Sequence, residues 1–334
     1  MPTISVLLPC RDVEGVLPDA MESLRLQTFG DFEVIAVDDG SRDHTWAQLL
    51  EWAWRDPRVR PLRTARRGLV PALATAQAYA RGELVARMDA DDVAEPTRLA
   101  AQVGLLARHP DVAACGTHVR YFPRAEVREG ALRYEEWLNS LCSPATVERE
   151  IFVECPLAHP SLLVRRSVLL AVGGYRDVGW AEDYDLVLRL WAAGYHMAVV
   201  PEVLLHWREA PQRASRMDQR YAPEAFRRCK VYYLARTLVA GRDGVVVWGA
   251  GPVGKAFARE LLAQGLTLRA FVDLDPRKIG QEIHGVPVVD RSEIDRFRGA
   301  FAVAAVGSPG AREDIRADLD QAGWREMTDY CAVA

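Results

Sequence analysis

Residues 82–96 read GELVARMDADDVAEP, a short apolar run that ends in a cluster of acidic side chains. The apolar residues between positions 84 and 88 predict a buried β-strand. Asp89, Asp91 and Asp92 follow at once, and carboxylates so close together repel one another unless a positive charge lies nearby. The stretch therefore predicts a strand that delivers acidic groups to a binding site.

The spacing of these acidic residues suits a hard metal ion. In an extended segment, residues i and i+2 project to one face, so Asp89 and Asp91 can converge on one cation such as Mg²⁺ or Mn²⁺. Such ions take oxygen ligands and often share them with the phosphates of a substrate. The alternative is a solvated turn that caps a helix beginning near Pro96. The other motifs of the chain favour the metal site.

The composition is that of a soluble globular protein. The chain has 334 residues, of which 49% are hydrophobic and 26% are charged, and this length suggests about two domains. The formal net charge of −4 gives no basic surface for nucleic acid or for an anionic membrane. The cysteines are scattered, without a Cys-x-x-Cys pair, and indicate a reducing compartment.

No apolar run approaches the roughly 18 residues of a membrane span, and the N-terminus enters a strand without the pattern of a signal peptide. We therefore expect a cytoplasmic protein without a transmembrane segment. Peripheral docking on a membrane and assembly into a homo-oligomer both stay open.

Strand and helix patterns alternate along the first part of the chain. Continuous apolar runs predict buried parallel strands at 4–9 and 32–37. Apolar residues at helical spacing predict helices at 16–27, 46–54 and 69–81. This alternation favours a doubly wound α/β sheet, in which ligands bind beyond the carboxyl ends of the strands. Arg11, Asp39 and the acidic cluster all fall at such ends, so we expect three loops to bring polar groups to one edge of the sheet.

Four ordered motifs in this region resemble those of one enzyme family. They are ISVLLP at 4–9, QTFGDFE at 27–33, VDDGS at 37–41 and RMDADD at 87–92. The later segments GGY at 173–175 and WAEDYD at 180–185 fit the same pattern. Together they resemble a family-2 glycosyltransferase over roughly residues 1–235. The resemblance implies the GT-A fold, a single α/β domain that binds a nucleotide sugar.

The resemblance also implies roles for particular residues. Asp39 is expected to bind the uracil end of the donor, Asp89 to lie near the ribose or the metal, and Asp91 to ligate the metal on the diphosphate. Asp183 is expected to be the catalytic base. The remaining donor-binding positions that it implies are Pro9, Arg11, Arg67 and Ala90.

Sugar transfer calls for such groups on chemical grounds as well. The departing diphosphate gains negative charge, which a metal held by Asp91 would neutralise. An acceptor hydroxyl needs a carboxylate to take its proton, and Asp183 suits that task. Attack opposite the leaving group inverts the anomeric centre in one displacement, so one base suffices. For Glu182 and Asp183 the alternative is that acidic residues cap the start of a helix.

Several other segments have two interpretations each. His159 either contacts the acceptor or is a core histidine, and His206 either completes a metal site or is structural. The loop Gln212–Arg216 either closes its arginines over the donor diphosphate or is a solvated surface loop. Residues 120–150 are expected to form an irregular, acceptor-facing insertion whose aromatic residues mostly pack in the core.

The pattern restarts near residue 239, which predicts a second domain at 239–334 after a first domain at 1–238. A strand at 245–248 leads into a glycine-rich turn with Gly249, Gly251 and Gly254, then a helix, and then a strand that ends in Asp273. The segment resembles the small Rossmann-like modules of sugar-modifying enzymes. It predicts either a second nucleotide or nucleotide-sugar site formed by these four residues, or a degenerate structural or assembly module.

Two classes of function follow. The first is an inverting, metal-dependent glycosyltransferase that moves a hexosyl or N-acetylhexosaminyl group from a nucleoside-diphosphate sugar, UDP-linked by preference. Its acceptor would be a glycan, a lipid-linked or a small molecule in the synthesis of a surface polysaccharide. The alternative is an NAD(P)-dependent oxidoreductase or a nucleotide sensor governed by the C-terminal glycine turn. The ordered set Asp39, Asp89, Asp91 and Asp183 favours the transferase, because a redox enzyme has no use for it.

Overall fold

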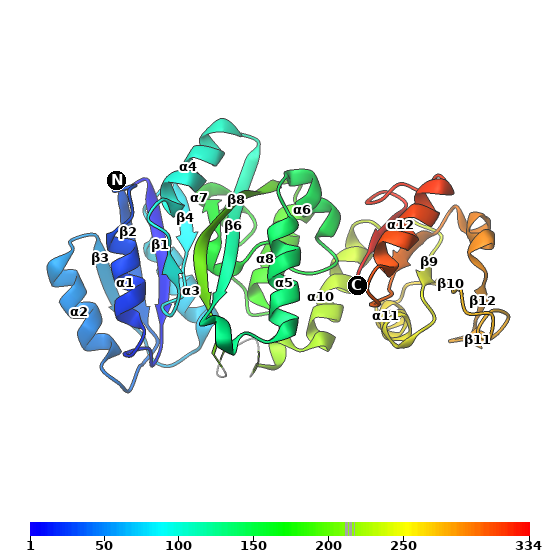
Figure 1. Ribbon diagram of the computed structural model, residues 1–334, viewed down its shortest axis with the longest axis horizontal. Helices are drawn as coiled ribbons and strands as arrows, with labels where there is room; N and C mark the ends of the chain where they lie inside the picture. The colour runs from blue at the N-terminus through cyan, green and yellow to red at the C-terminus, as the bar shows by residue number, and fades with distance from the viewer. Residues whose placement is uncertain (211–212, 214–215, 217) are drawn as a thin grey trace. The chain divides into compact units, whose positions relative to one another are not determined.

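The computed structural model of the protein describes residues 1–210, 213, 216 and 218–334 (Figure 1). Contacts between Cα atoms divide the chain into two compact units. The first comprises Met1–Glu148, Pro156–Val178 and Glu182–Met217, and the second comprises Arg149–Cys155, Gly179–Ala181 and Asp218–Ala334. Helix α10 (Pro223–Arg236) is part of the second unit. The domain boundary after residue 238 stays a prediction.

An eight-stranded sheet forms the core of the first unit, in the order β3-β2-β1-β4-β7-β6-β8-β5. Strands β3, β2, β1 and β4 are parallel, β7 is antiparallel to both of its neighbours, β8 is parallel to β6, and β5 is antiparallel to β8. The strands are β1 (Ile4–Cys10), β2 (Phe32–Asp38), β3 (Val59–Arg63), β4 (Leu84–Arg87), β5 (Val93–Ala94), β6 (Val112–Phe122), β7 (Leu163–Arg165) and β8 (His196–Arg208).

The apolar runs of the sequence become the central parallel strands. Every residue of β2 is buried, and in β1 only Pro9 is half-buried. Strands that bury both faces carry mostly apolar side chains on both sides, which is why these runs are nearly continuous rather than alternating. The buried polar residues Ser5 and Glu33 are joined by a hydrogen bond, which the Ser5 hydroxyl donates at 2.7 Å. The predicted strands at 4–9 and 32–37 therefore match β1 and β2 to within one residue.

Helices flank this sheet (Figure 1). Helix α3 packs on β1 and β2, α2 packs on β3, and α4 packs on β6. The three helices predicted in the first 81 residues are present and differ from the prediction only at their ends. The helices are α1 (Leu17–Arg25), α2 (Thr45–Arg55), α3 (Leu69–Tyr79), α4 (Arg98–Arg108), α5 (Glu129–Ser140), α6 (Pro144–Glu150), α7 (Arg166–Ala171) and α8 (Glu182–Ala192), with the 3-10 turns η1 (Arg124–Glu126) and η2 (His159–Ser161).

The prediction of an irregular insertion over residues 120–150 was wrong. Strand β6 continues to Phe122, and most of the remaining residues form α5 and α6. Helix α5 buries only Glu135 and Leu138, and the carboxylate of Glu135 accepts a hydrogen bond from the backbone N–H of Tyr121 at 2.6 Å. An acidic residue on the buried face hides the apolar stripe by which a helix is recognised in a sequence.

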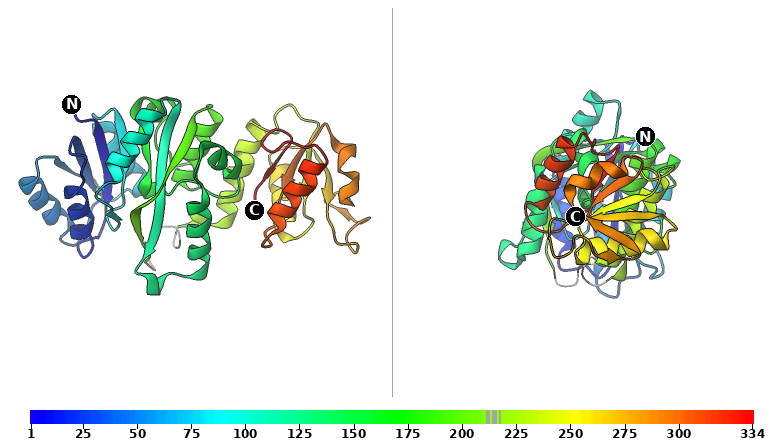
Figure 2. Two further views of the ribbon diagram at one scale, coloured as in Figure 1. Left: turned by 45° about the horizontal axis from the view of Figure 1, so that its top comes forward. Right: turned by 90° about the vertical axis from the view of Figure 1, so that its right-hand side faces the viewer.

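The second unit has its own six-stranded sheet in the order β11-β12-β10-β9-β13-β14, drawn in yellow to red in Figure 2. All neighbouring pairs are parallel except β11 and β12. The predicted strands at 245–248 and 268–272 are β9 and β10. The elements are β9 (Val245–Trp248), β10 (Leu268–Val272), β11 (Glu282–Ile283), β12 (Val286–Val289), β13 (Phe301–Ala304), β14 (Tyr330–Ala332), α10, α11 (Pro252–Ala263), α12 (Ala311–Gln321), and the turns η3 (Gln219–Tyr221) and η4 (Arg291–Phe297).

Among the described residues, the structure has no helix with the length and apolar character needed to span a bilayer.

Candidate active site

The register of the parallel strands brings two predicted loops to one edge of the first sheet. Cys10 lies opposite Asp38 in the pairing of β1 with β2, and Leu7 lies opposite Arg87 in the pairing of β1 with β4. The N–H of Asp39 continues this ladder to the carbonyl of Cys10 at 2.9 Å. Asp39 and the acidic loop after β4 therefore leave the sheet at its carboxyl edge, as the sequence predicts.

Asp39 is buried and anchors the loop that precedes α3. One of its carboxylate oxygens accepts a hydrogen bond from the N–H of Arg67 and the other from the N–H of Gly68, both at 2.8 Å. Gly68 has a φ of +101°, which a residue with a side chain would adopt only with strain. The guanidinium of Arg11 lies 3.7 Å from the same carboxylate, and Pro9 lies half-buried at the end of β1. Two of the predicted donor-binding residues, Arg11 and Arg67, therefore lie at the Asp39 carboxylate.

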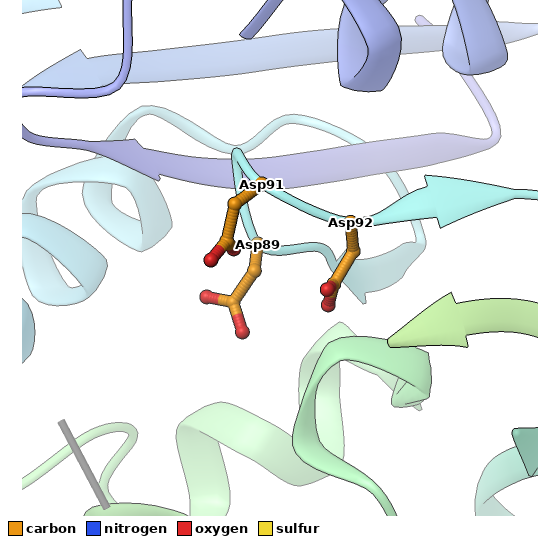
Figure 3. Close-up of side chains that lie close together, drawn as sticks. All are labelled: Asp89, Asp91 and Asp92. Atoms are coloured by element: carbon orange, nitrogen blue, oxygen red, sulfur yellow. The ribbon is translucent and has the colours of Figure 1, made fainter. Parts of the chain in front are cut away.

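The side chains of Asp89, Asp91 and Asp92 point to the same side of the loop after β4 (Figure 3). A carboxylate oxygen from each lies within 4.8 Å of one from both others. Asp92 is fully buried, and one of its oxygens accepts a hydrogen bond from the N–H of Arg208 at 2.7 Å. The other oxygen has no hydrogen-bond partner among the described residues. Clustered oxygens, one of them buried and unpaired, fit a divalent cation. Ala90, buried between them, contributes no polar side-chain atom.

The electrostatics of the cluster point the same way. Burial and the neighbouring Asp89 raise the pKa of Asp91 to about 6. Burial, Asp89 and Asp91 raise the pKa of Asp92 well above its usual value. A carboxylate resists ionisation when it is removed from water and placed beside other carboxylates, and a bound cation would relieve both effects.

Asp183 lies half-buried at the start of α8, beside the buried carboxylate of Glu182. Burial and the negative charge of Glu182 raise the pKa of Asp183 to about 7. One oxygen of Asp183 accepts a hydrogen bond from the N–H of Tyr184 at 2.7 Å. A carboxylate with a pKa near neutrality has the proton affinity that a general base needs.

Arg87, the last residue of β4, is a buried charged residue that sequence reasoning missed. Its guanidinium is 3% exposed and lies 2.5 Å from a carboxylate oxygen of Asp89. Its positive charge also opposes the rise that burial and nearby carboxylates cause in the pKa of both Asp91 and Asp183. The signal available in the sequence was a lone arginine inside the apolar run that forms β4. Arg87 is thus a buried cation that pairs with the acidic loop and acts electrostatically on Asp183 at the start of α8.

The family assignment follows from a comparison with known proteins. The model of the family described as "Glycosyl transferase family 2" matches residues 5–172, half of the chain. The chain belongs to glycosyl transferase family 2. The matched residues include β1 apart from Ile4, β2, β4 and the acidic loop, while α8 with Asp183 lies beyond them.

Relatives of this glycosyltransferase include proteins from bacteria. It is 27% identical to the putative glycosyltransferase EpsE of Bacillus subtilis over 66% of this chain and 78% of that protein. It is 29% identical to the amylovoran biosynthesis glycosyltransferase AmsE of Erwinia amylovora, over 57% of this chain and 69% of that protein.

Two solved structures share its fold. The complex of S. aureus TarS 1-349 with UDP-GlcNAc has a TM-score of 0.57 at 16% identity and covers 70% of this chain and 66% of that one. The mannosyltransferase PcManGT of Pyrobaculum calidifontis, solved with GDP-Man and Mn²⁺, has a TM-score of 0.51 at 24% identity and covers 79% of this chain and 69% of that one. At these identities the likeness confirms the GT-A fold of the glycosyltransferase.

The two histidines of uncertain role have protein partners in the glycosyltransferase. Nε2 of His206 lies 2.6 Å from a carboxylate oxygen of Glu95. Among the described residues, the only group of three side chains suited to a metal is the aspartate cluster, and His206 is outside it. His159 is buried, with Nδ1 3.6 Å from Glu182 and Nε2 3.2 Å from the hydroxyl of Tyr175. Burial and the charge of Arg87 lower the pKa of His159 well below its usual value, so the ring is neutral at pH 7.

The predicted loop Gln212–Arg216 lies partly outside the described residues, which include Arg213 and Arg216. Both arginines pair with Glu209, at 3.4 Å and 2.6 Å. The guanidinium of Arg213 also lies 4.5 Å from the ring centre of Trp207. Its charge lowers the pKa of Asp91 against the larger effects of burial and Asp89. Arg213 is therefore a positive group beside the acidic loop.

In the second unit of the glycosyltransferase, Asp273 binds the glycine-rich turn. One of its oxygens accepts hydrogen bonds from the N–H of Ala250 at 2.8 Å and from Nζ of Lys278 at 3.0 Å. The other accepts from the N–H of Asp275 at 2.9 Å. The predicted ligand-binding carboxylate thus has structural partners, and its role toward a ligand stays a prediction.

Proposed function

We propose that the protein transfers a sugar, with inversion, from a nucleoside-diphosphate sugar to an acceptor hydroxyl during polysaccharide biosynthesis. UDP is the preferred nucleotide and Mn²⁺ or Mg²⁺ the preferred metal. The observation that carries the proposal is the cluster of Asp89, Asp91 and Asp92, in which one buried oxygen of Asp92 has no hydrogen-bond partner among the described residues. Membership of glycosyl transferase family 2 supports it over the oxidoreductase alternative.

The names of similar proteins support the finer parts of the proposal. One relative is named for amylovoran biosynthesis, which favours a polysaccharide product. One structural neighbour was solved with UDP-GlcNAc and another with GDP-Man and Mn²⁺, which favours a nucleotide-sugar donor and a metal. The acceptor is proposed to carry its hydroxyl on a glycan, a lipid-linked or a small molecule. All six cysteines are free, which suits the proposed cytoplasmic location.

Each residue would contribute a separate part of the reaction. Asp89 and Asp91, with Asp92 behind them, would hold the divalent cation, which supplies a Lewis acid for the negative charge of the departing diphosphate. Asp39 and the loop that it anchors would receive the base of the nucleotide. Arg213 would attract the diphosphate, because guanidinium groups pair well with phosphate oxygens.

Asp183 would act as the general base. Its carboxylate accepts the proton of the acceptor hydroxyl while the hydroxyl oxygen forms a bond to the anomeric carbon. The bond from that carbon to the phosphate oxygen breaks, and the nucleoside diphosphate leaves with the electron pair. A single displacement of this kind inverts the anomeric centre. A pKa near 7 lets Asp183 be ionised at neutral pH and still hold the proton.

A panel of UDP- and GDP-sugars tests the proposal. The wild-type chain is incubated with each donor and Mn²⁺, and release of the nucleoside diphosphate is measured with and without EDTA. We expect a UDP-sugar to release UDP, and we expect EDTA to abolish this release. The ¹H NMR spectrum of the product should show the anomeric configuration opposite to that of the donor sugar. In Asp91→Asn the metal-dependent release should fall at least tenfold, while Asp111→Asn, an exposed carboxylate, serves as the control. Release that EDTA leaves unchanged would contradict metal dependence.

A further inference from the structure

A cavity of about 480 Å³ lies within the second unit, beyond the carboxyl ends of β9, β10 and β13. All of its lining residues belong to that unit, so it is separate from the proposed donor site. In the sheet order β12-β10-β9-β13-β14, the chain runs from β9 in one direction to β10 and β12, and later in the other direction to β13 and β14. The cavity therefore lies at the point where the strand order reverses, which is where open parallel sheets bind ligands.

The three glycines of the turn after β9 differ in whether the fold leaves room for a side chain at their position. A Cβ on Gly249 would lie 2.6 Å from a methyl group of Val306, and one on Gly254 would lie 1.7 Å from the carbonyl oxygen of Gly249. Packing accounts for Gly254, and packing together with a φ of +111° accounts for Gly249. Gly251 has an ordinary φ of −85°, and no atom lies within 4 Å of the position of its Cβ. Gly251 lines the cavity, so the missing side chain leaves room there that the fold itself does not require.

The lining of the cavity includes apolar side chains, two of which are open to solvent. Leu274 is 54% exposed and Val253 is 39% exposed, and both line the cavity together with Val306 and Ile315. Exposed apolar side chains around a concave site favour a flat apolar surface such as a nucleobase. A cavity of this size is within the usual range for small-molecule sites, which is about 300–1,000 Å³.

The charged groups that line the cavity disfavour a ligand with a phosphate group on its ribose. Lys278 is the only cationic residue that lines it among the described residues, and it pairs with Asp273 at 3.0 Å. Asp318 pairs with Arg291 at 2.9 Å, and Asp314 is exposed. Carboxylates accept hydrogen bonds from sugar hydroxyls but repel a phosphate placed on them. The cavity therefore suits a ribose with free hydroxyl groups.

We propose that this cavity is a second nucleotide site, which binds a nucleoside diphosphate that carries a further hydroxyl-rich group and no phosphate on its ribose. The base lies against Leu274 and Val253, and the diphosphate lies at the turn beside Gly251. Both NAD⁺ and a UDP-sugar have this chemistry. The second site is independent of the transferase reaction proposed above.

Isothermal titration of the 334-residue chain tests the second site. NAD⁺, UDP-N-acetylglucosamine and NADP⁺ are titrated separately in EDTA, where the metal-dependent donor site should bind weakly. We expect either NAD⁺ or UDP-N-acetylglucosamine to bind, which identifies the source of the nucleotide. The affinity for NADP⁺ should be at least tenfold lower than that for NAD⁺ if NAD⁺ is the ligand.

Variants separate the second site from the donor site. Gly251→Val should weaken binding in EDTA at least tenfold, and so should Leu274→Glu, which changes an exposed residue and leaves folding intact. Leu262→Ala, an exposed residue of α11 outside the cavity, should bind as the wild type does. Absence of binding by both NAD⁺ and UDP-N-acetylglucosamine, or binding that both cavity variants leave unchanged, overturns the inference. Binding of UDP with Mn²⁺ by Gly251→Val shows in the same samples that the donor site is intact.

Discussion

The buried guanidinium of Arg87 lies 2.5 Å from a carboxylate oxygen of Asp89. Among the described residues, Nε of Arg87 has no hydrogen-bond partner although it is buried. A buried charge without full hydrogen bonding is costly, so the ion pair with Asp89 has to offset part of the desolvation of Arg87. Its charge acts both on the acidic loop and on Asp183, which makes it the electrostatic link between the two parts of the proposed active site.

Replacing Arg87 by methionine should move the pH dependence of turnover. The positive charge of Arg87 opposes the rise that burial and Glu182 cause in the pKa of Asp183. Without it the pKa of Asp183 rises further, so the acid limb of the kcat profile should shift above pH 7. Stability should also fall by about 1–3 kcal/mol, because Asp89 loses its charged partner. Rates from pH 5 to pH 9 and urea unfolding measure the two effects.

Arg87→Lys is the matched control, because it keeps the positive charge. Its acid limb should stay close to that of the wild type even if its stability changes. An Arg87→Met enzyme whose acid limb coincides with the wild-type limb would show that Arg87 does not act on the base.

Asp183→Asn should remove turnover and spare donor binding. An amide cannot take the proton of the acceptor hydroxyl, and loss of a general base typically costs about 10²- to 10⁴-fold in rate. The affinity for UDP with Mn²⁺, measured by titration, should stay within about twofold because Asp183 is not among the proposed donor ligands. Asp111→Asn controls for the loss of a carboxylate at the surface. Full turnover by Asp183→Asn would assign the base to another residue.

The central strands and their acidic ends could be predicted from the sequence. Buried parallel strands such as β1 and β2 consist of continuous apolar runs, and the polar residues that follow them must meet at the carboxyl edge. This rule placed Asp39 and the acidic loop correctly at one edge. The same rule could not predict the position of β7 in the sheet, because its antiparallel pairing with β4 joins residues that are about eighty positions apart.

The buried polar contacts could not be predicted from patterns. Sequence periodicity reports where apolar side chains face the core, whereas Arg87, Glu182 and His159 are polar residues that are nevertheless buried. Arg87 pairs with Asp89 two residues further on, and His159 lies beside Glu182, more than twenty positions away. Glu135 is a similar case in α5. Such residues look like solvent-facing positions until the partner is known.

Asp39→Ala should weaken both the fold and donor binding. The substitution leaves the N–H groups of Arg67 and Gly68 without their acceptor, which should cost about 1–3 kcal/mol in the free energy of unfolding. The affinity for UDP should fall as well if the uracil binds there. Asp43→Ala is the control, because Asp43 also accepts hydrogen bonds from loop N–H groups, those of Glu14 and Thr45. It should lose stability and keep its UDP affinity, whereas an equal loss of affinity in both would indicate a purely structural role for Asp39.

Glu182→Gln should shift the acid limb in the direction opposite to Arg87→Met. Burial is the larger cause of the raised pKa of Asp183, and the negative charge of Glu182 is the next. Removing that charge lowers the pKa of Asp183, so the base is ionised at lower pH and the acid limb of kcat should move below pH 7. General damage to the site would lower kcat at every pH. It would not move the acid limb of the kcat profile down in Glu182→Gln and up in Arg87→Met. Limbs that move the same way in Glu182→Gln and Arg87→Met would therefore contradict the role of Asp183 as the titrating base.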